Sequence, residues 1–304
     1  YLNEKLKFNG LKFFVKDSWS VSDKLTVFPA LVFHTEDYLD KQLVEPRLSM
    51  EYEHRDDLVF SAGTGVYYAM PDYAEINEVF GNPELEYVRS IHAVVGAQKF
   101  FSSELDIKTE LYVKESDNLV TGDDTLRYAN NGEGTAFGLD TIVHKTLNDK
   151  ISGWFALSLS RAERRHKITG DRFDFDYDQP FNLSLVGNYK LSERWNASAK
   201  LWVHSGAPYT PVTGATERPD EPGTYDPIYG EINSKRFPVY HRLDLRFDRT
   251  IRSGNGRHIS TYLEIANILG TKNVSDYDYN VDYSQRTEIE QLPRLISLGF
   301  KADF

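Results

Sequence analysis

The feature that most constrains the fold is a two-residue alternation of apolar and polar side chains along unusually long segments. In the segment 105–114, Leu105, Ile107 and Leu111 take one face, while mostly charged residues take the other. Successive side chains of a β-strand point to opposite faces, so this period predicts strands with one apolar and one polar face. The same pattern recurs at 181–189, 196–203, 242–251 and 296–304.

The connections between these segments alternate in length. Together the segments predict about 13 antiparallel strands, from near Leu11 to Phe304, with no helix. The short connections are 20–24, 53–57, 101–104, 147–150, 191–194 and 252–257. The long ones, rich in Gly, Pro, Asp, Asn and Tyr, are 37–45, 71–85, 119–134, 163–180, 205–237 and 271–293.

Two all-β architectures fit this pattern. A soluble sandwich or lipocalin-like barrel would bury the apolar faces, but soluble strands are usually about 5–6 residues long, roughly half the length of these. An outer-membrane barrel turns its apolar faces to lipid and its charged faces to a wet lumen, with short turns on the periplasmic side. The mean hydropathy of −0.50 is compatible with such strands. With 19 Tyr and 18 Phe, the sequence favours an antiparallel transmembrane β-barrel.

Strand parity adds a constraint on closure. The first and last predicted strands run in the same direction, because each leads from the long-loop side to the short-turn side, so the strand count is odd. Single-chain bacterial barrels have even counts, and an open edge facing lipid leaves unpaired backbone groups. We therefore expect that this chain cannot close a barrel alone and forms part of a larger one.

Composition and motifs argue against several other classes. The net charge of −11 disfavours a nucleic-acid partner, and the absence of Cys removes thiolate metal sites. We find no phosphate-binding loop, nucleophile elbow, helical histidine pair or cofactor motif. The start, YLNEKLKFNG, lacks the pattern of a secretion signal. We expect no enzymatic activity and no cofactor.

Several stretches, in order, resemble the C-terminal half of a TonB-dependent outer-membrane receptor. The most specific are FPVYHRLDLRFDRTI (237–251), YLEIANILGTKNVSDYDYN (262–280) and LPRLISLGFKADF (292–304). WVHSGAPYTP (202–211) and NNGEGTAFGLD (130–140) resemble the family's passages between strand and loop. The resemblance implies that residues 1–304 are about the last 13 strands of a 22-stranded barrel, with 1–10 the end of an extracellular loop.

The resemblance also implies a function and partners. It implies energy-coupled uptake of a scarce ligand, such as an iron–siderophore, cobalamin or an oligosaccharide, across the outer membrane of a Gram-negative bacterium. The partners would be membrane lipid, the barrel-assembly machinery, TonB with ExbB and ExbD, and an N-terminal plug in the same or a separate chain. A passive porin without TonB coupling remains the alternative.

Candidate site residues lie in the largest loop and at the C-terminus. Aromatic rings with a few polar groups suit a ligand vestibule, so Tyr209, Tyr225, Tyr229 and Asp226 are ligand-binding candidates, although any exposed loop can have this composition. Phe300 and Phe304 resemble the signal read by the barrel-assembly machinery; the alternative is an ordinary apolar strand residue.

Two acidic loops, 170–180 and 275–283, have the oxygen-rich composition that calcium prefers. No glycine occupies the place that a tight calcium loop needs. We therefore interpret both loops as solvated and predict no metal site.

Overall fold

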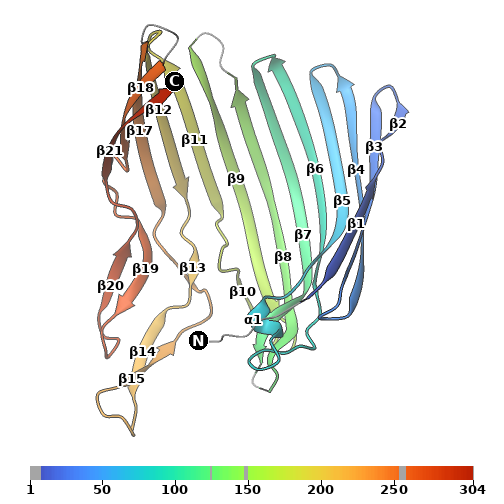
Figure 1. The fold of residues 1–304 in the computed structure, drawn as a ribbon. Coiled ribbons are helices and arrows are strands. Elements are labelled where there is room, and N and C mark those ends of the chain that lie inside the picture. Colours follow the sequence, from blue (N-terminus) through green and yellow to red (C-terminus); the bar gives the residue numbers. More distant parts are fainter. Residues whose placement is uncertain (1–7, 124, 147–149, 253–257, 304) are drawn as a thin grey trace. The chain divides into compact units, whose positions relative to one another are not determined.

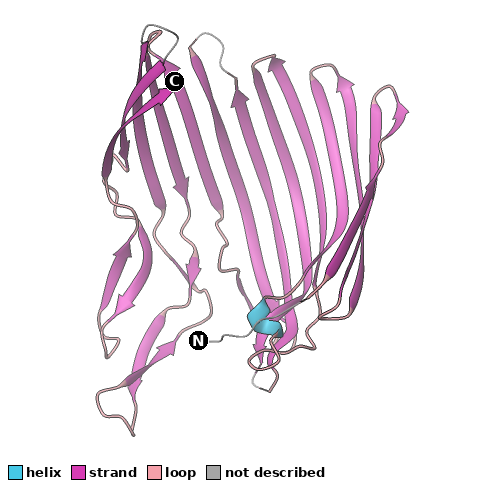
Figure 2. Cartoon of the chain, in the orientation of Figure 1, coloured by secondary structure: helices cyan, strands magenta, loops and turns pink. Residues whose placement is uncertain are grey.

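The computed structural model describes residues 8–123, 125–146, 150–252 and 258–303. Figure 2 shows that the regular secondary structure of this part of the chain is β-strand, apart from a single short helix, α1 (Tyr73–Ile76). No helix in the described ranges has the length and apolar character needed to cross a membrane.

The chain divides into two compact units. The first comprises Tyr1–Lys99, Glu110–Gly138 and Ala162–Phe173, and the second comprises the remaining residues. Among the described residues, thirteen strands follow one another in two hydrogen-bonded runs, β1-β3-β4-β5-β6-β7-β8 and β9-β11-β12-β17-β18-β21 (Figure 1). The predicted number of about 13 strands is therefore confirmed.

The long strands form these two runs. Their bounds are β1 (Gly10–Lys16), β3 (Leu25–Glu36), β4 (Lys41–Arg55), β5 (Leu58–Ala69), β6 (Val88–Ser102), β7 (Leu105–Asp123), β8 (Arg127–Lys145), β9 (Ile151–His166), β11 (Phe181–Lys190), β12 (Trp195–His204), β17 (Tyr240–Arg252), β18 (His258–Ala266) and β21 (Leu295–Asp303). The short strands are β2 (Trp19–Ser22), β10 (Arg172–Asp174), β13 (Pro208–Tyr209), β14 (Val212–Glu217), β15 (Tyr225–Tyr229), β16 (Lys235–Arg236), β19 (Val274–Tyr279) and β20 (Arg286–Glu290).

Cross-strand register puts apolar side chains on one face of the sheet. In the antiparallel pair β18–β21, Ile265 lies opposite Ile296 and Leu263 lies opposite Leu298. Leu298 is 80% exposed, so this face is not covered by another layer of the same unit. Apolar residues directly opposite one another on an uncovered face are typical of a surface that meets lipid or a partner.

The main buried cluster of the first unit lies among its loops, not on its sheet. Ile76 and Leu85 are each 1% exposed and pack with Leu39 and Tyr87. The Tyr38 hydroxyl donates a hydrogen bond of 3.0 Å to the Ile76 carbonyl. The connections that follow β3 and β5 therefore support each other at one end of the strands.

The structure corrects the sequence-based description of several connections. Residues 71–85 contain α1, which begins after Asp72 with a capping box from Glu75 and is too short to produce a helical period. The predicted long connections 37–45 and 119–134 are mostly strand, because β4 starts at Lys41 and β7 and β8 extend to Asp123 and from Arg127. Alternation there is interrupted by polar residues on both faces, which hides the strands in the sequence.

The two last long connections also contain secondary structure. Residues 205–237 contain β13 to β16, and residues 271–293 contain the hairpin β19–β20. Both were expected to be loops because 205–237 is rich in Gly and Pro and 271–293 is rich in Asp and Asn, and these residue types are depleted in strands. The predicted turn 191–194 is confirmed, whereas 253–257 and 147–149 lie outside the described residues.

Candidate ligand-binding site

The large connection 205–237 leaves β12 and returns to β17 within the second unit. Its two ends run side by side. Pro208 pairs with Arg236, and the Phe237 amide donates a hydrogen bond of 3.0 Å to the Ala207 carbonyl. A Cβ atom on Gly206 would lie 1.9 Å from the Phe237 carbonyl oxygen, so only glycine permits this approach. The close approach holds the two ends of the connection together just before Tyr209, which pairs with Lys235.

Three aromatic rings and an arginine form a cluster beside this entry. Tyr209 stacks on Phe237 with centroids 4.6 Å apart, and Tyr277 lies 5.2 Å from both rings. The Arg286 guanidinium lies 3.8 Å from the centre of the Tyr277 ring and donates a hydrogen bond of 3.2 Å to the Tyr209 hydroxyl. We call Tyr209, Phe237, Tyr277 and Arg286 the ring cluster.

The chemistry of the ring cluster combines flat apolar faces with positive charge. Partial burial raises the pKa of the Tyr277 phenol, and the nearby Arg286 cation opposes this shift. The phenol therefore stays neutral at ordinary pH, and Arg286 supplies the positive charge. Such a set of groups suits a ligand with a planar surface and negative charge.

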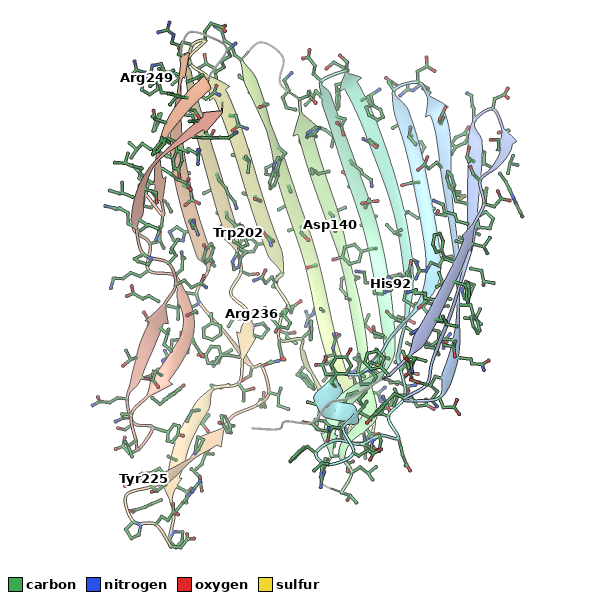
Figure 3. All side chains as sticks on the ribbon, viewed as in Figure 1. His92, Asp140, Trp202, Tyr225, Arg236 and Arg249 are labelled. Carbon is green, nitrogen blue, oxygen red and sulfur yellow. The ribbon has the colours of Figure 1, made fainter. Side chains whose placement is uncertain are left out.

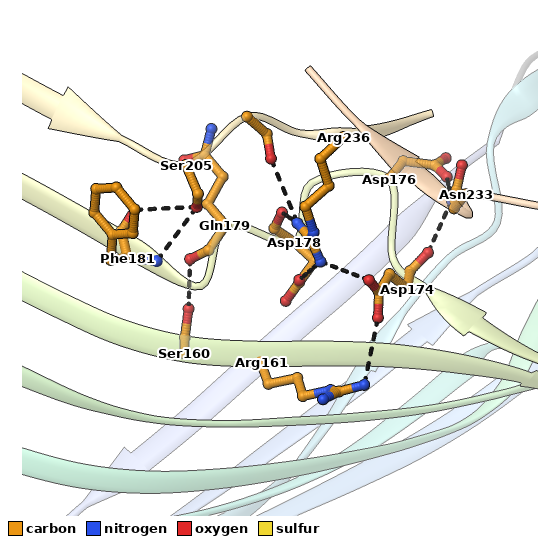
Figure 4. Close-up of polar contacts among 11 residues, drawn as sticks. Ser160, Arg161, Asp174, Asp176, Asp178, Gln179, Phe181, Ser205, Asn233 and Arg236 are labelled. Atoms are coloured by element: carbon orange, nitrogen blue, oxygen red, sulfur yellow. Dashed lines mark hydrogen bonds and ion pairs between the residues drawn. The ribbon is translucent and has the colours of Figure 1, made fainter. Parts of the chain in front are cut away.

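A second polar network connects 205–237 to the acidic connection before β11 (Figure 4). Arg236 binds Asp174 at 2.6 Å and also forms an ion pair with Asp178, whose side chain is 1% exposed. The Asn233 side-chain amide donates a hydrogen bond of 2.8 Å to the Asp174 carbonyl and one of 2.6 Å to the Asp176 carboxylate. We call these five residues the Arg236 network, and it anchors the base of the large loop.

The Arg236 network also accounts for the acidic composition of the loop 170–180. Two of its carboxylates, those of Asp174 and Asp178, contact the same guanidinium. In 275–283, the Asp282 carboxylate accepts from the Ser284 amide at 3.0 Å. Among the described residues no group of three or more His, Asp or Glu side chains is placed to hold a metal ion.

The other three ligand-binding candidates lie in the hairpin β14–β15. Tyr225 pairs with Glu217, Asp226 with Thr216, and Tyr229 is 63% exposed. Arg218 donates 2.9 Å and 2.6 Å bonds to Asp226, and this hydrogen bonding holds the pKa of the carboxyl below its ordinary value. In Figure 3, Tyr225 lies at the tip of the second unit and Arg236 lies nearer the long strands.

The sequence-predicted residues thus occupy two places. Tyr209 belongs to the ring cluster, whereas Tyr225, Tyr229 and Asp226 belong to the hairpin. Sequence reasoning missed Phe237, Tyr277, Arg286 and Arg236. The available signal was an isolated cation inside an acidic and aromatic segment, as at Arg286 in 275–293.

The structure describes only one of the two residues of the predicted assembly signal. Phe300 lies in β21 opposite Thr261 and is 78% exposed on the apolar face. Phe304 lies outside the described residues. The role of both as an assembly signal stays a prediction.

Long antiparallel strands with an uncovered apolar face are typical of the wall of an outer-membrane β-barrel. The sequence model of the family described as "TonB dependent receptor-like, beta-barrel" matches residues 1–268. The chain therefore belongs to the TonB-dependent receptor β-barrel family, which confirms the resemblance and the predicted fold class. A search of curated proteins finds no match.

Solved structures have the same fold at low sequence identity. The outer membrane transporter YddB from Escherichia coli matches with a TM-score of 0.69 and 12% identity, over 97% of this chain and 45% of that one. The pyoverdine outer membrane receptor FpvA from Pseudomonas aeruginosa PAO1 matches with a TM-score of 0.71 and 13% identity, over 98% of this chain and 42% of that one. The siderophore receptor PirA from Pseudomonas aeruginosa matches with a TM-score of 0.63 and 12% identity, over 87% of this chain and 44% of that one. This chain spans less than half the length of each of these proteins.

Proposed function

We propose that residues 1–304 are the C-terminal part of the barrel of an energy-coupled receptor, which takes up a scarce ligand across the outer membrane of a Gram-negative bacterium. Residues 1–10 would be the end of an extracellular loop. The long connections would face the outside and the short turns the periplasm. The chain would carry out binding and transport, without covalent chemistry.

The ring cluster is the observation that carries this proposal. It is built from two connections that are distant in sequence, 205–237 and 271–293, and it presents three rings with one guanidinium. Groups gathered from separate loops over a rigid scaffold are typical of binding sites. A ferric siderophore, with its flat chelating groups and negative charge, fits these groups best among the ligand classes considered.

The names of the similar structures favour the same ligand class. Two of them are described as a pyoverdine receptor and a siderophore receptor. Because their identity to this chain is 12–13%, their ligands suggest a class of compound to test and not a particular compound.

Energy-coupled uptake requires partners beyond this chain. TonB, driven with ExbB and ExbD by the inner-membrane proton gradient, would act on a plug with a TonB box in the same or a separate polypeptide. Lipid would surround the apolar face, and the barrel-assembly machinery would insert the protein. No nucleic acid would be bound.

A passive channel is the second candidate. The polar face of the second unit carries ion pairs of the kind that line water-filled barrels: Arg246 binds Asp248 at 2.8 Å and Glu264 at 3.0 Å. A channel lined in this way needs no high-affinity ligand. Binding affinity at the ring cluster therefore separates the two functions.

The binding test uses the purified full-length receptor and a panel of ferric siderophores, haem, cobalamin and oligosaccharides. For the compound that binds, Arg286→Gln and Tyr209→Ala should each weaken the affinity about tenfold, because each removes one contact of a shared cluster. Arg55→Gln, which removes an exposed cation paired at 3.5 Å with Asp57, is the control and should bind normally. Unchanged affinity in both cluster variants would contradict the proposed site.

A further inference from the structure

The apolar face of the second unit contains a groove with one cation at its edge. The groove has a volume of about 600 Å³, and it lies across β12, β17, β18 and β21. Its side chains are mostly aromatic and aliphatic, and the ring cluster is not part of it. The lining includes Trp195, Phe247, Leu263, Leu298 and Phe300, with Arg249 among them.

Strand register explains how the hollow forms. Trp195, Arg249, Thr261 and Phe300 lie opposite one another in a row across the four strands. Thr261 is the smallest of the four, so it leaves a depression between Arg249 and Phe300. The next row on the same face is Ala197, Phe247, Leu263 and Leu298, and it continues the hollow toward the middle of the strands.

Arg249 is unusual in these rows because all other members are uncharged. An arginine on the lipid face of a barrel costs about 2–4 kcal/mol at the midplane and little near the interface. Arg249 lies near the end of β17, at the end of the second unit where β21 also ends, whereas Tyr225 lies at the opposite end (Figure 3). Its guanidinium lies 5.4 Å from the centre of the Trp195 ring, which holds it beside the groove.

We propose that this groove binds one glycerophospholipid, with the phosphate on Arg249 and an acyl chain along Phe247, Leu263 and Leu298. A guanidinium matches a phosphate through two parallel hydrogen bonds. A tryptophan beside it is typical of the interface between membrane and water. The exposed fraction of Leu298 is 80%, so an acyl chain can reach the groove from the bilayer.

The choice of a glycerophospholipid depends on the proposed orientation of the receptor. The short turns would face the periplasm, and β17 and β21 end on that side, where the inner leaflet supplies glycerophospholipids. Lipid A, in the outer leaflet, carries phosphates too but would lie at the other end of the strands. The test must therefore compare the two lipids.

Native mass spectrometry of the full-length receptor in detergent tests the proposal. The delipidated protein is titrated with phosphatidylglycerol, with lipid A, or with glycerol phosphate alone. The expected result is one tightly held phosphatidylglycerol, weak binding of lipid A, and no competition by glycerol phosphate. Because transport is not involved, the result is independent of the uptake experiment.

Three variants locate the site. Arg249→Gln should weaken phosphatidylglycerol binding about tenfold by removing the charge-assisted bonds. Thr261→Leu should do the same by filling the depression while keeping the cation. Arg194→Gln, which removes an exposed cation from the turn 191–194 at the same end of the second unit, is the matched control and should bind as wild type.

Heat-modifiable migration in gels checks that each variant is folded. If Arg249→Gln does not fold, Thr261→Leu alone decides the question. Wild-type affinity in both folded groove variants would overturn the proposal. Preference for lipid A, or a dimer that excludes lipid from the groove, would also overturn it.

Discussion

Arg236 forms an ion pair with Asp178, a carboxylate that is 1% exposed although it lies in a connection between strands. Removing the guanidinium takes an ion-pair partner away from a buried carboxylate, and such a loss is strongly destabilising. We predict that Arg236→Ala loosens both 170–180 and 205–237 without unfolding the long strands. Amide hydrogen exchange of the full-length protein should show faster exchange in these two connections only.

Arg218→Ala is the matched control for this variant. Arg218 also binds an aspartate, Asp226, but the two side chains are 45% and 54% exposed. Exposed pairs contribute only about 0–1 kcal/mol. Exchange in 170–180 should therefore stay at the wild-type rate in Arg218→Ala. Equal loosening by both variants would show that burial of Asp178 has no special role.

The hairpin β14–β15 should respond to acid through Asp226. The hydrogen bond from Arg218 lowers the pKa of Asp226 below its ordinary value of 3.8. A lowered pKa contributes stability that is present above that ordinary value and is lost as the pH falls through the pKa in the folded state. Pepsin should cut Asp226→Asn faster than wild type at about pH 5, and the difference should shrink as the pH falls below 3.8. A difference that grows on acidification would have the wrong sign.

Two adjacent positions of β7 can test which face of the strands meets the membrane. Leu111 is 55% exposed on the apolar face, whereas Glu110 points to the polar face. Leu111→Arg should cost about 2–4 kcal/mol near the bilayer midplane, and Glu110→Arg should cost less. The folded fraction of the full-length receptor in lipid vesicles measures both. The reverse order of the two effects would contradict this assignment of the apolar and polar faces.

The predicted assembly signal calls for a kinetic test. Deleting Phe304 from the full-length receptor should reduce the amount that reaches the outer membrane several-fold, because the terminal aromatic residue would be read during insertion by strand addition. The receptors that do arrive should melt at nearly the wild-type temperature. A normal amount in the membrane with a much lower melting temperature would instead indicate a packing role.

How far the sequence predicts the fold depends on whether a pattern is local. Leu243, Leu245 and Phe247 alternate within one strand, and the structure places all three on the same face of β17. Alternation over long strands also gave the strand number. The helix α1 and the hairpin β19–β20 escaped prediction because four residues are too few for a helical period and because Asp and Asn interrupt the strand pattern.

The candidate site was less predictable because its contacts are distant in sequence. Tyr209 and Arg286 meet through a hydrogen bond across 77 residues. Asp178 and Arg236 are 58 residues apart. Composition marked 205–237 and the acidic loops as unusual, but their contacts join residues from separate connections, which a local pattern does not reveal.

Energy dependence of uptake distinguishes an energy-coupled receptor from a passive channel. A Gram-negative host that expresses the full-length receptor is given the labelled compound that binds in the panel, and accumulation is measured with and without TonB and with a proton-gradient uncoupler. We predict that accumulation against a gradient disappears when either TonB or the proton gradient is removed, while surface binding of the compound remains. Accumulation that continues unchanged under both conditions would contradict it and would identify a passive channel.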